Sequence, residues 1–251
     1  FHVMTKGFPA RIHVLIAQQA PIGLVIRRGP SKQVATILWD RRTDQFQLGQ
    51  WLKGRIYERR SDLSPDGKYF IYFAMNGKWQ SESMGSWTAI SCAPYLKALV
   101  MIPWGDCWAG GGLWTSTTGY WLNGNVNPMR DSDLVQRDKT YAPQGGVGLE
   151  CQSVYYPRLL RDGWELEHLE PRTDWLSKTD TFGKSLSHGW TLRKFAHASS
   201  NPPPGKGVYW DTHQLIHTPS NTVMDFSEWE WAEYDGHRLV WAAEGKLYAG
   251  T

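Results

Sequence analysis

The sequence predicts an all-β fold, and three observations lead to this expectation. The 251 residues include 15 Trp, and aromatic residues make up 14% of the chain. Aromatic side chains fit the pleated, half-buried surface of a strand. There are also 25 Gly and 14 Pro, which supply many turn positions. The apolar residues of the N-terminal third form short runs, without the long 3.6-residue period of an amphipathic helix.

The N-terminal strands follow one another at short intervals. We expect strands at residues 11–17, 22–28 and 34–40, since each is rich in Ile, Val and Leu and is bounded by Gly, Pro or Asp. Alternating residues between 46 and 50 indicate a fourth strand. The intervals between these runs are short enough to be turns.

The clearest local signal is a turn at residues 64–67, with the sequence Ser-Pro-Asp-Gly. Proline presets φ for a turn, and the Asp-Gly pair supplies the positive φ that a tight hairpin needs. A strand follows at residues 68–74. Further strands are expected at residues 87–92, 98–104, 113–117 and 120–123.

Two segments read as loops within a single domain that spans residues 1–251. Residues 124–150 are poor in hydrophobic residues and predict a long surface loop, and residues 201–205 form a Pro-rich loop. Residues 208–217 then read as a strand, and the turn at 235–236 opens another at 237–242.

Two segments carry a resemblance to a known fold. Residues 63–72 and 234–248 each place Asp-Gly at a turn between two apolar runs, and they resemble the strand-turn-strand unit of TolB-type and WD-repeat-like β-propellers. The resemblance implies a ring of four-stranded blades around a central channel. Some fifteen to twenty strands would then give about five blades. It implies almost nothing about function.

The charge of the chain argues against a nucleic-acid partner. The net charge is only +3, whereas nucleic-acid binding needs a dense basic surface. A local basic cluster, Arg55, Arg59 and Arg60, lies among Glu58 and Asp62, and we interpret it as a solvated face.

The sequence also gives an expectation for the compartment. No apolar run approaches the ~20 residues of a membrane span, and the start lacks the pattern of a signal peptide. The chain begins at Phe1, which leaves open a leader or tag removed before it. The three cysteines, Cys92, Cys107 and Cys151, are odd in number and form no CxxC pair, so buried free thiols are expected. Together these features favour a soluble protein of the cytoplasm.

Histidines and acidic residues concentrate late in the chain and are the candidate ligands of a divalent metal. The candidates are His188, His213, His217 and Asp211. His213 and His217 would share a face on a helix, but on a strand their Cβ atoms lie ~13 Å apart, too far for one ion. Because residues 208–217 read as a strand, a metal site would need histidines from different blades to converge.

The tryptophans are the candidates for ligand binding. Trp229 and Trp231 flank Glu230 and would point to one side of a strand, and Trp104 and Trp108 lie in a Trp-rich segment. Exposed aromatic faces stack on sugars or aromatic ligands and anchor protein interfaces. Most of the tryptophans are expected to pack between blades.

Two functions therefore stay open. The first is a binding module that holds a protein or a small ligand through aromatic-rich loops. The second is a hydrolase at the channel mouth, in which a metal ion would activate water against a lactone, phosphoester or glycoside. The absence of a known catalytic motif favours the first.

Overall fold

The computed structural model describes residues 8–29, 32–144, 151–171 and 176–251. Within these residues the protein is all-β apart from a single α-helix, α1 (Gln152–Arg161), and two short 3-10 turns, so the predicted all-β class is confirmed. No helix in the described part of the chain is long and apolar enough to cross a membrane.

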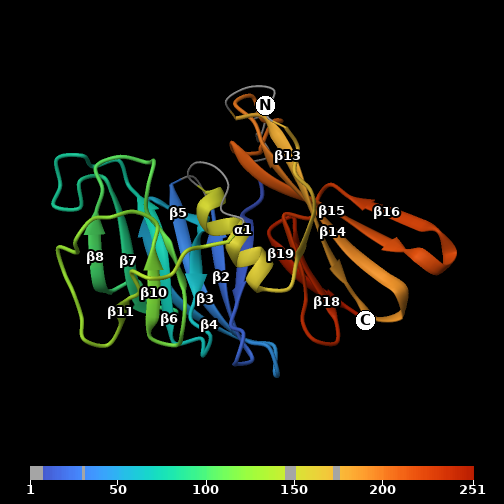
Figure 1. The fold of residues 1–251 in the computed structure, drawn as a ribbon, viewed down its shortest axis with the longest axis horizontal. Helices are drawn as coiled ribbons and strands as arrows, with labels where there is room; N and C mark the ends of the chain where they lie inside the picture. Colours follow the sequence, from blue (N-terminus) through green and yellow to red (C-terminus); the bar gives the residue numbers. More distant parts are fainter. Residues whose placement is uncertain (1–7, 30–31, 145–150, 172–175) are drawn as a thin grey trace, which may run out of the picture. The chain divides into compact units, whose positions relative to one another are not determined.

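The strands form five sheets, and within each sheet the strands follow the order of the chain (Figure 1). The sheets are β1 (Arg11–Ile16), β2 (Ile22–Arg28), β3 (Gln33–Asp40) and β4 (Gln45–Lys53); β5 (Arg55–Leu63), β6 (Tyr69–Met75), β7 (Ser86–Cys92) and β8 (Ala98–Pro103); β9 (Gly112–Trp114), β10 (Gly119–Leu122) and β11 (Gln136–Arg137); β12 (Glu165–His168), β13 (Lys178–Ser185), β14 (Trp190–Ala198), β15 (Tyr209–His217) and β16 (Thr222–Phe226); and β17 (Trp231–Tyr234), β18 (Leu239–Ala243) and β19 (Lys246–Gly250).

Two compact units divide the chain. One, called here the first unit, comprises residues 13–162, and the second unit comprises residues 163–251 together with the segment that ends at Ile12. The 124–150 segment belongs to the first unit, and its described part, 124–144, is loop except for the short strand β11, which pairs in parallel with β10. The 201–205 segment lies in the second unit as a loop between β14 and β15. The single propeller ring stays a prediction.

The 64–67 turn has the predicted geometry. Gly67 has a φ of 77°, and its N–H donates to the carbonyl of Ser64 at 2.8 Å. The Ser64 hydroxyl accepts from the N–H of Tyr69 at 2.8 Å, which fixes the start of β6. The turn also packs closely, because a Cβ on Gly67 would lie 2.8 Å from the Cβ of Ile22.

The basic cluster of β5 corrects the solvated-face prediction. Arg59, Arg60 and Asp62 are buried. The guanidinium of Arg60 donates to the carbonyls of Ala109 and Cys107, at 2.9 and 2.7 Å, and lies 4.7 Å from the centre of the Phe73 ring. These partners are distant in sequence, and they replace the water that the charged groups would otherwise need.

An ion pair between Asp62 and Arg161 joins β5 to α1 inside the first unit. The two terminal nitrogens of Arg161 donate to the two carboxylate oxygens of Asp62, at 2.6 and 2.9 Å. The backbone N–H of Trp114, at the end of β9, donates to the same carboxylate at 2.8 Å. Asp62 is 1% exposed, so its charge depends on these donors rather than on water.

We expect Gly67→Ala to destabilise the protein more than Gly77→Ala does. Both positions have positive φ, and an L side chain there costs about 1–2 kcal/mol. Only Gly67 also lacks space, since a Cβ at Gly77 meets nothing within 4 Å. Thermal and denaturant unfolding of the two variants measures the difference. Equal losses would show that the contact with Ile22 does not restrict the turn.

We expect Arg161→Met to lower the free energy of unfolding by about 3–5 kcal/mol, because Asp62 would keep a buried charge without its main partner. Arg42→Met is the matched control. Arg42 pairs with Asp40 at 3.7 Å, but its side chain is 72% exposed, and surface pairs contribute at most about 1 kcal/mol. Denaturant unfolding tests both, and similar losses would contradict a special role for the buried pair.

Candidate functional site

The second unit contains a cavity of about 460 Å³ that is lined by residues of its two sheets. Most of its wall is apolar or aromatic. The apolar and aromatic residues of the wall include Trp190, Leu215, Met224, Phe226, Trp229 and Trp241.

The strand register brings the wall of one sheet together. Side chains alternate across a strand, so His213 and Leu215 of β15 point to the same face. On β16, Phe226 pairs with His213 and Met224 pairs with Leu215, so both project to that face as well. On β14, Trp190 pairs with His217. The alternation therefore collects apolar side chains from three neighbouring strands.

Aromatic rings form a continuous stack at the cavity. The ring centres of Phe226 and Trp229 are 3.8 Å apart, those of Trp229 and Trp241 are 4.9 Å apart, and those of Trp241 and Tyr248 are 5.6 Å apart. The interplanar angles are 13°, 20° and 12° in the same order. Because each inner ring is held between two others, the wall is rigid.

A few polar groups accompany the apolar wall. The hydroxyls of Ser187 and Tyr234 are 3.4 Å apart. Arg238 also lines the cavity, and its guanidinium pairs with Asp235 at 3.4 Å, so its charge is balanced. Such a cavity suits a largely apolar ligand that makes one or two hydrogen bonds.

Of the four predicted ligand-binding tryptophans, only Trp229 lines this cavity. Trp231 is buried at the start of β17, whereas Trp229 precedes that strand, so the strand argument for a shared side does not apply. Trp104 and Trp108 lie in the first unit. The Trp104 indole N–H donates to the Thr88 hydroxyl at 2.8 Å, and Trp108 is 58% exposed.

The predicted metal ligands lie on or near β15 but do not converge. Asp211 and His213 are buried on this strand, and His217 lies at its end. The strand predicted for residues 208–217 is therefore confirmed. A ring nitrogen of His217 contacts the carbonyl oxygen of His188 at 3.2 Å, so the two histidines meet through a backbone atom. Among the residues that the structure describes, no three His, Cys, Asp or Glu side chains form a group able to hold a metal ion.

The cysteines only partly follow the expectation of buried thiols. Cys151 is buried, Cys92 is half-buried and Cys107 is exposed, and none of the three forms a disulfide among the described residues. Cys107 lies in the loop after β8, where its carbonyl accepts from Arg60 at 2.7 Å. The loop therefore contributes its backbone to the interior, and the thiol stays at the surface.

His213 is buried beside the aromatic stack. Its Nδ1 donates to the carbonyl of Trp229 at 3.0 Å, and its Nε2 has no hydrogen-bond partner among the described residues. Burial lowers the pKa of His213 to about 3. The positive charge of Lys194, the residue opposite His213 on the neighbouring strand β14, acts on this pKa in the same direction. Asp211 opposes the shift more weakly. His213 is therefore a neutral residue that supports the cavity wall.

His213 gives the protein a predicted acid sensitivity. The folded-state pKa of about 3 lies below the usual histidine pKa of 6.5, so the unfolded chain binds more protons between these values. Stability is then lost as the pH falls from about 6.5, by about 2 kcal/mol at pH 5. We expect His213→Gln to lose less stability than the wild type between pH 7.5 and pH 5, as measured by urea unfolding. An identical loss of stability in both proteins would show that His213 is not the source of the acid sensitivity.

Comparison with known proteins gives no family. No family model matches the sequence, and no curated protein matches it. Among solved structures, hydrazine synthase of Kuenenia stuttgartiensis aligns with a TM-score of 0.31 and 10% identity over 97% of this chain and 76% of that one. Cobalt-substituted ACO of Synechocystis aligns with a TM-score of 0.22 and 9% identity over 100% of this chain and 51% of that one.

Proposed function

We propose that the second unit is a binding module for a small, flat and largely apolar ligand, which occupies the aromatic cavity. The observation that carries this proposal is the stack of Phe226, Trp229 and Trp241 beside a cavity of about 460 Å³. Ligand cavities of proteins usually measure about 300–1,000 Å³ and combine an apolar wall with a few polar groups.

The rigidity of the wall favours binding. Trp229 is 5% exposed and is held between two parallel rings, so a ligand does not have to order it. A flat ligand gains area burial at about 25 cal/mol per Å². The hydroxyls of Ser187 and Tyr234 would orient a polar substituent.

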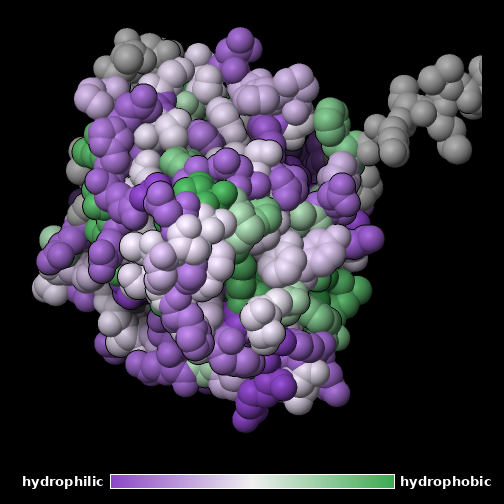
Figure 2. Space-filling view, turned by 90° about the vertical axis from the view of Figure 1, so that its right-hand side faces the viewer, coloured by the Kyte–Doolittle hydropathy of each residue, from purple (hydrophilic) through white to green (hydrophobic). Residues whose placement is uncertain are grey.

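On one face of the molecule, the distribution of apolar residues favours a small ligand over a protein partner. On the face shown in Figure 2, hydrophobic residues form separate areas between hydrophilic ones. A protein interface generally has a broader apolar centre surrounded by a polar rim. The absence of a nucleic-acid partner and a cytoplasmic location stay predictions from charge and cysteine usage.

The same proposal includes the architecture. Five sheets, each built from strands consecutive in the chain, are what about five propeller blades would produce. In such an arrangement the cavity would lie between two successive blades, formed by β12–β16 and β17–β19.

The neutral fluorescent probe N-phenyl-1-naphthylamine tests the cavity. We expect the native protein to bind it saturably, and we expect Met224→Glu to weaken binding at least tenfold, because a carboxylate in the apolar wall must be desolvated. Val223→Glu is the matched control. Val223 is the neighbouring residue on β16, is 55% exposed and points to the opposite face, and it introduces the same charge.

The expected pattern is a loss for Met224→Glu and wild-type affinity for Val223→Glu. Equal affinity in both variants, or no binding to the native protein, would overturn the proposal. Circular dichroism of both variants checks that the strands are retained.

A further inference from the structure

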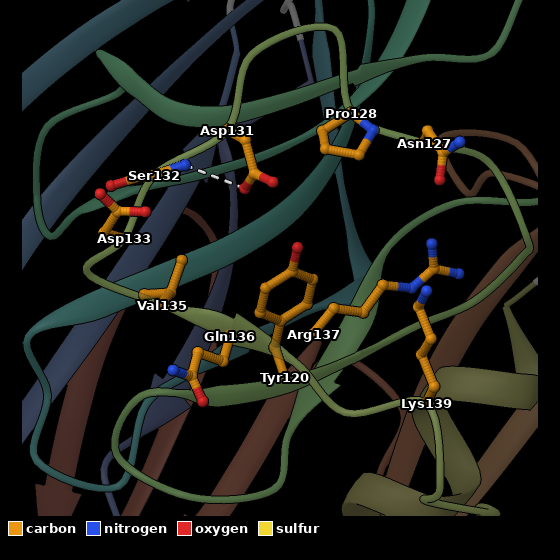
Figure 3. A pocket seen from close by; sticks show the side chains of 10 residues that line it. All are labelled: Tyr120, Asn127, Pro128, Asp131, Ser132, Asp133, Val135, Gln136, Arg137 and Lys139. Carbon is orange, nitrogen blue, oxygen red and sulfur yellow. Dashed lines mark hydrogen bonds between the residues drawn. The ribbon is translucent and has the colours of Figure 1, made fainter.

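A second cavity, of about 380 Å³, lies in the first unit beside β10 and β11 (Figure 3). It shares no residue with the aromatic cavity. Its wall is polar and includes Tyr120, Asn127, Asp131, Asp133, Arg137 and Lys139. We propose that this cavity binds a small zwitterion that carries an ammonium group and a carboxylate at opposite ends.

Tyr120 is the first support for the proposal. Its side chain is 2% exposed, and its hydroxyl points into the cavity (Figure 3). The hydroxyl has no hydrogen-bond partner within the described part of the chain. The ring is buried, and the hydroxyl is the part of the side chain that reaches the cavity, where water or a ligand can hydrogen-bond with it. A ligand in the cavity would supply the missing partner.

The arrangement of charge is the second support. In Figure 3 the carboxylates of Asp131 and Asp133 lie on one side of the Tyr120 hydroxyl, and the cationic groups of Arg137 and Lys139 lie on the other. None of these four side chains forms a salt bridge within the described residues. The Asp131 carboxylate accepts only the N–H of Ser132, at 2.9 Å. The cavity therefore presents opposite charges at its two ends, which complement a zwitterion.

Arg137 explains why the opposite charges do not neutralise each other. Its two terminal nitrogens donate to the carbonyls of Val126 and Gly124, at 2.9 and 2.6 Å. These bonds orient the guanidinium along its own loop and keep it from collapsing onto Asp131 or Asp133. The positive charge of the group is retained, because carbonyl oxygens do not neutralise it.

The loop that forms the cavity is anchored at both ends. The N–H of Met129 donates to the carbonyl of Met101 at 2.8 Å, and the N–H of Asp138 donates to the carbonyl of Tyr120 at 2.7 Å. Between these anchors, Val135 is 4% exposed and packs in the same core cluster as Tyr120. The backbone of this loop is therefore held in place before a ligand arrives, which lowers the entropy cost of binding.

Isothermal titration calorimetry with 4-aminobutanoate, 5-aminopentanoate and 6-aminohexanoate tests the proposal. We expect at least one chain length to bind saturably. The singly charged analogues pentanoate and pentylamine should bind at least tenfold more weakly than the best zwitterion, because each leaves one end of the cavity unmatched. No binding of any of the three zwitterions, or equal binding of a singly charged analogue, would overturn the proposal.

Variants identify the site. Tyr120→Phe removes only the hydroxyl, and we expect it to weaken binding about fivefold, as for the loss of one hydrogen bond. Asp133→Asn and Lys139→Gln should each weaken binding about tenfold. Glu82→Gln and Lys97→Gln make the same charge changes at exposed positions outside the cavity and should retain wild-type affinity. Retained affinity in Tyr120→Phe and Asp133→Asn, or equal losses in the controls, would place the zwitterion elsewhere and refute the proposal.

Discussion

The buried ion pair between Asp62 and Arg161 is the interaction on which the first unit depends most. A carboxylate that is 1% exposed is stable only when its oxygens accept several hydrogen bonds. The Asp62 carboxylate accepts two hydrogen bonds from the guanidinium of Arg161. It also accepts the N–H of Leu63 at 3.0 Å and the N–H of Trp114 at 2.8 Å. These donors come from β5, β9 and α1, so a single side chain fixes the meeting point of three elements. Removing one donor group leaves the others around a charge that water cannot reach.

The same ion pair also positions the polar cavity. Trp114, held by Asp62, pairs with Tyr120 across β9 and β10, and their ring centres are 6.2 Å apart at an angle of 65°. Tyr120 in turn directs its hydroxyl into the cavity. The interior of the unit is thus connected to the proposed site through packed rings and backbone pairs. A binding function at the cavity would place a constraint on Asp62 and Arg161 beyond stability.

The sequence predicted features that depend on neighbouring residues. The turn at Gly67 and the strand that carries His213 follow from turn chemistry and from alternation, and both are confirmed. The burial of Arg60 could not be predicted, because its partners Ala109 and Cys107 lie almost fifty residues away and offer backbone atoms, which leave no pattern in side-chain chemistry. Among the residues that line the aromatic cavity, Trp229 is the only one that the sequence indicated as a ligand-binding candidate. Its other walls depend on the register of β14, β15 and β16, which composition does not specify. The unpaired hydroxyl of Tyr120 is likewise a property of three-dimensional packing.

The two cavities represent opposite physical solutions to holding a small molecule. In the aromatic cavity, Phe226, Trp229 and Trp241 already stack on one another. A ligand there gains binding free energy by removing apolar surface from water. Such binding has a negative heat-capacity change and depends weakly on salt. In the polar cavity, Asp133 and Lys139 are exposed charges that keep their hydration until a ligand replaces it. Binding in the polar cavity is weakened by increasing ionic strength, because counterions screen the attraction between the exposed charges and the ligand. The Debye length that sets this screening is ~10 Å at 0.1 M salt. The salt dependence and the heat-capacity change of binding therefore show which of the two cavities a ligand occupies. This holds even for a ligand that has both a flat apolar face and a charged end.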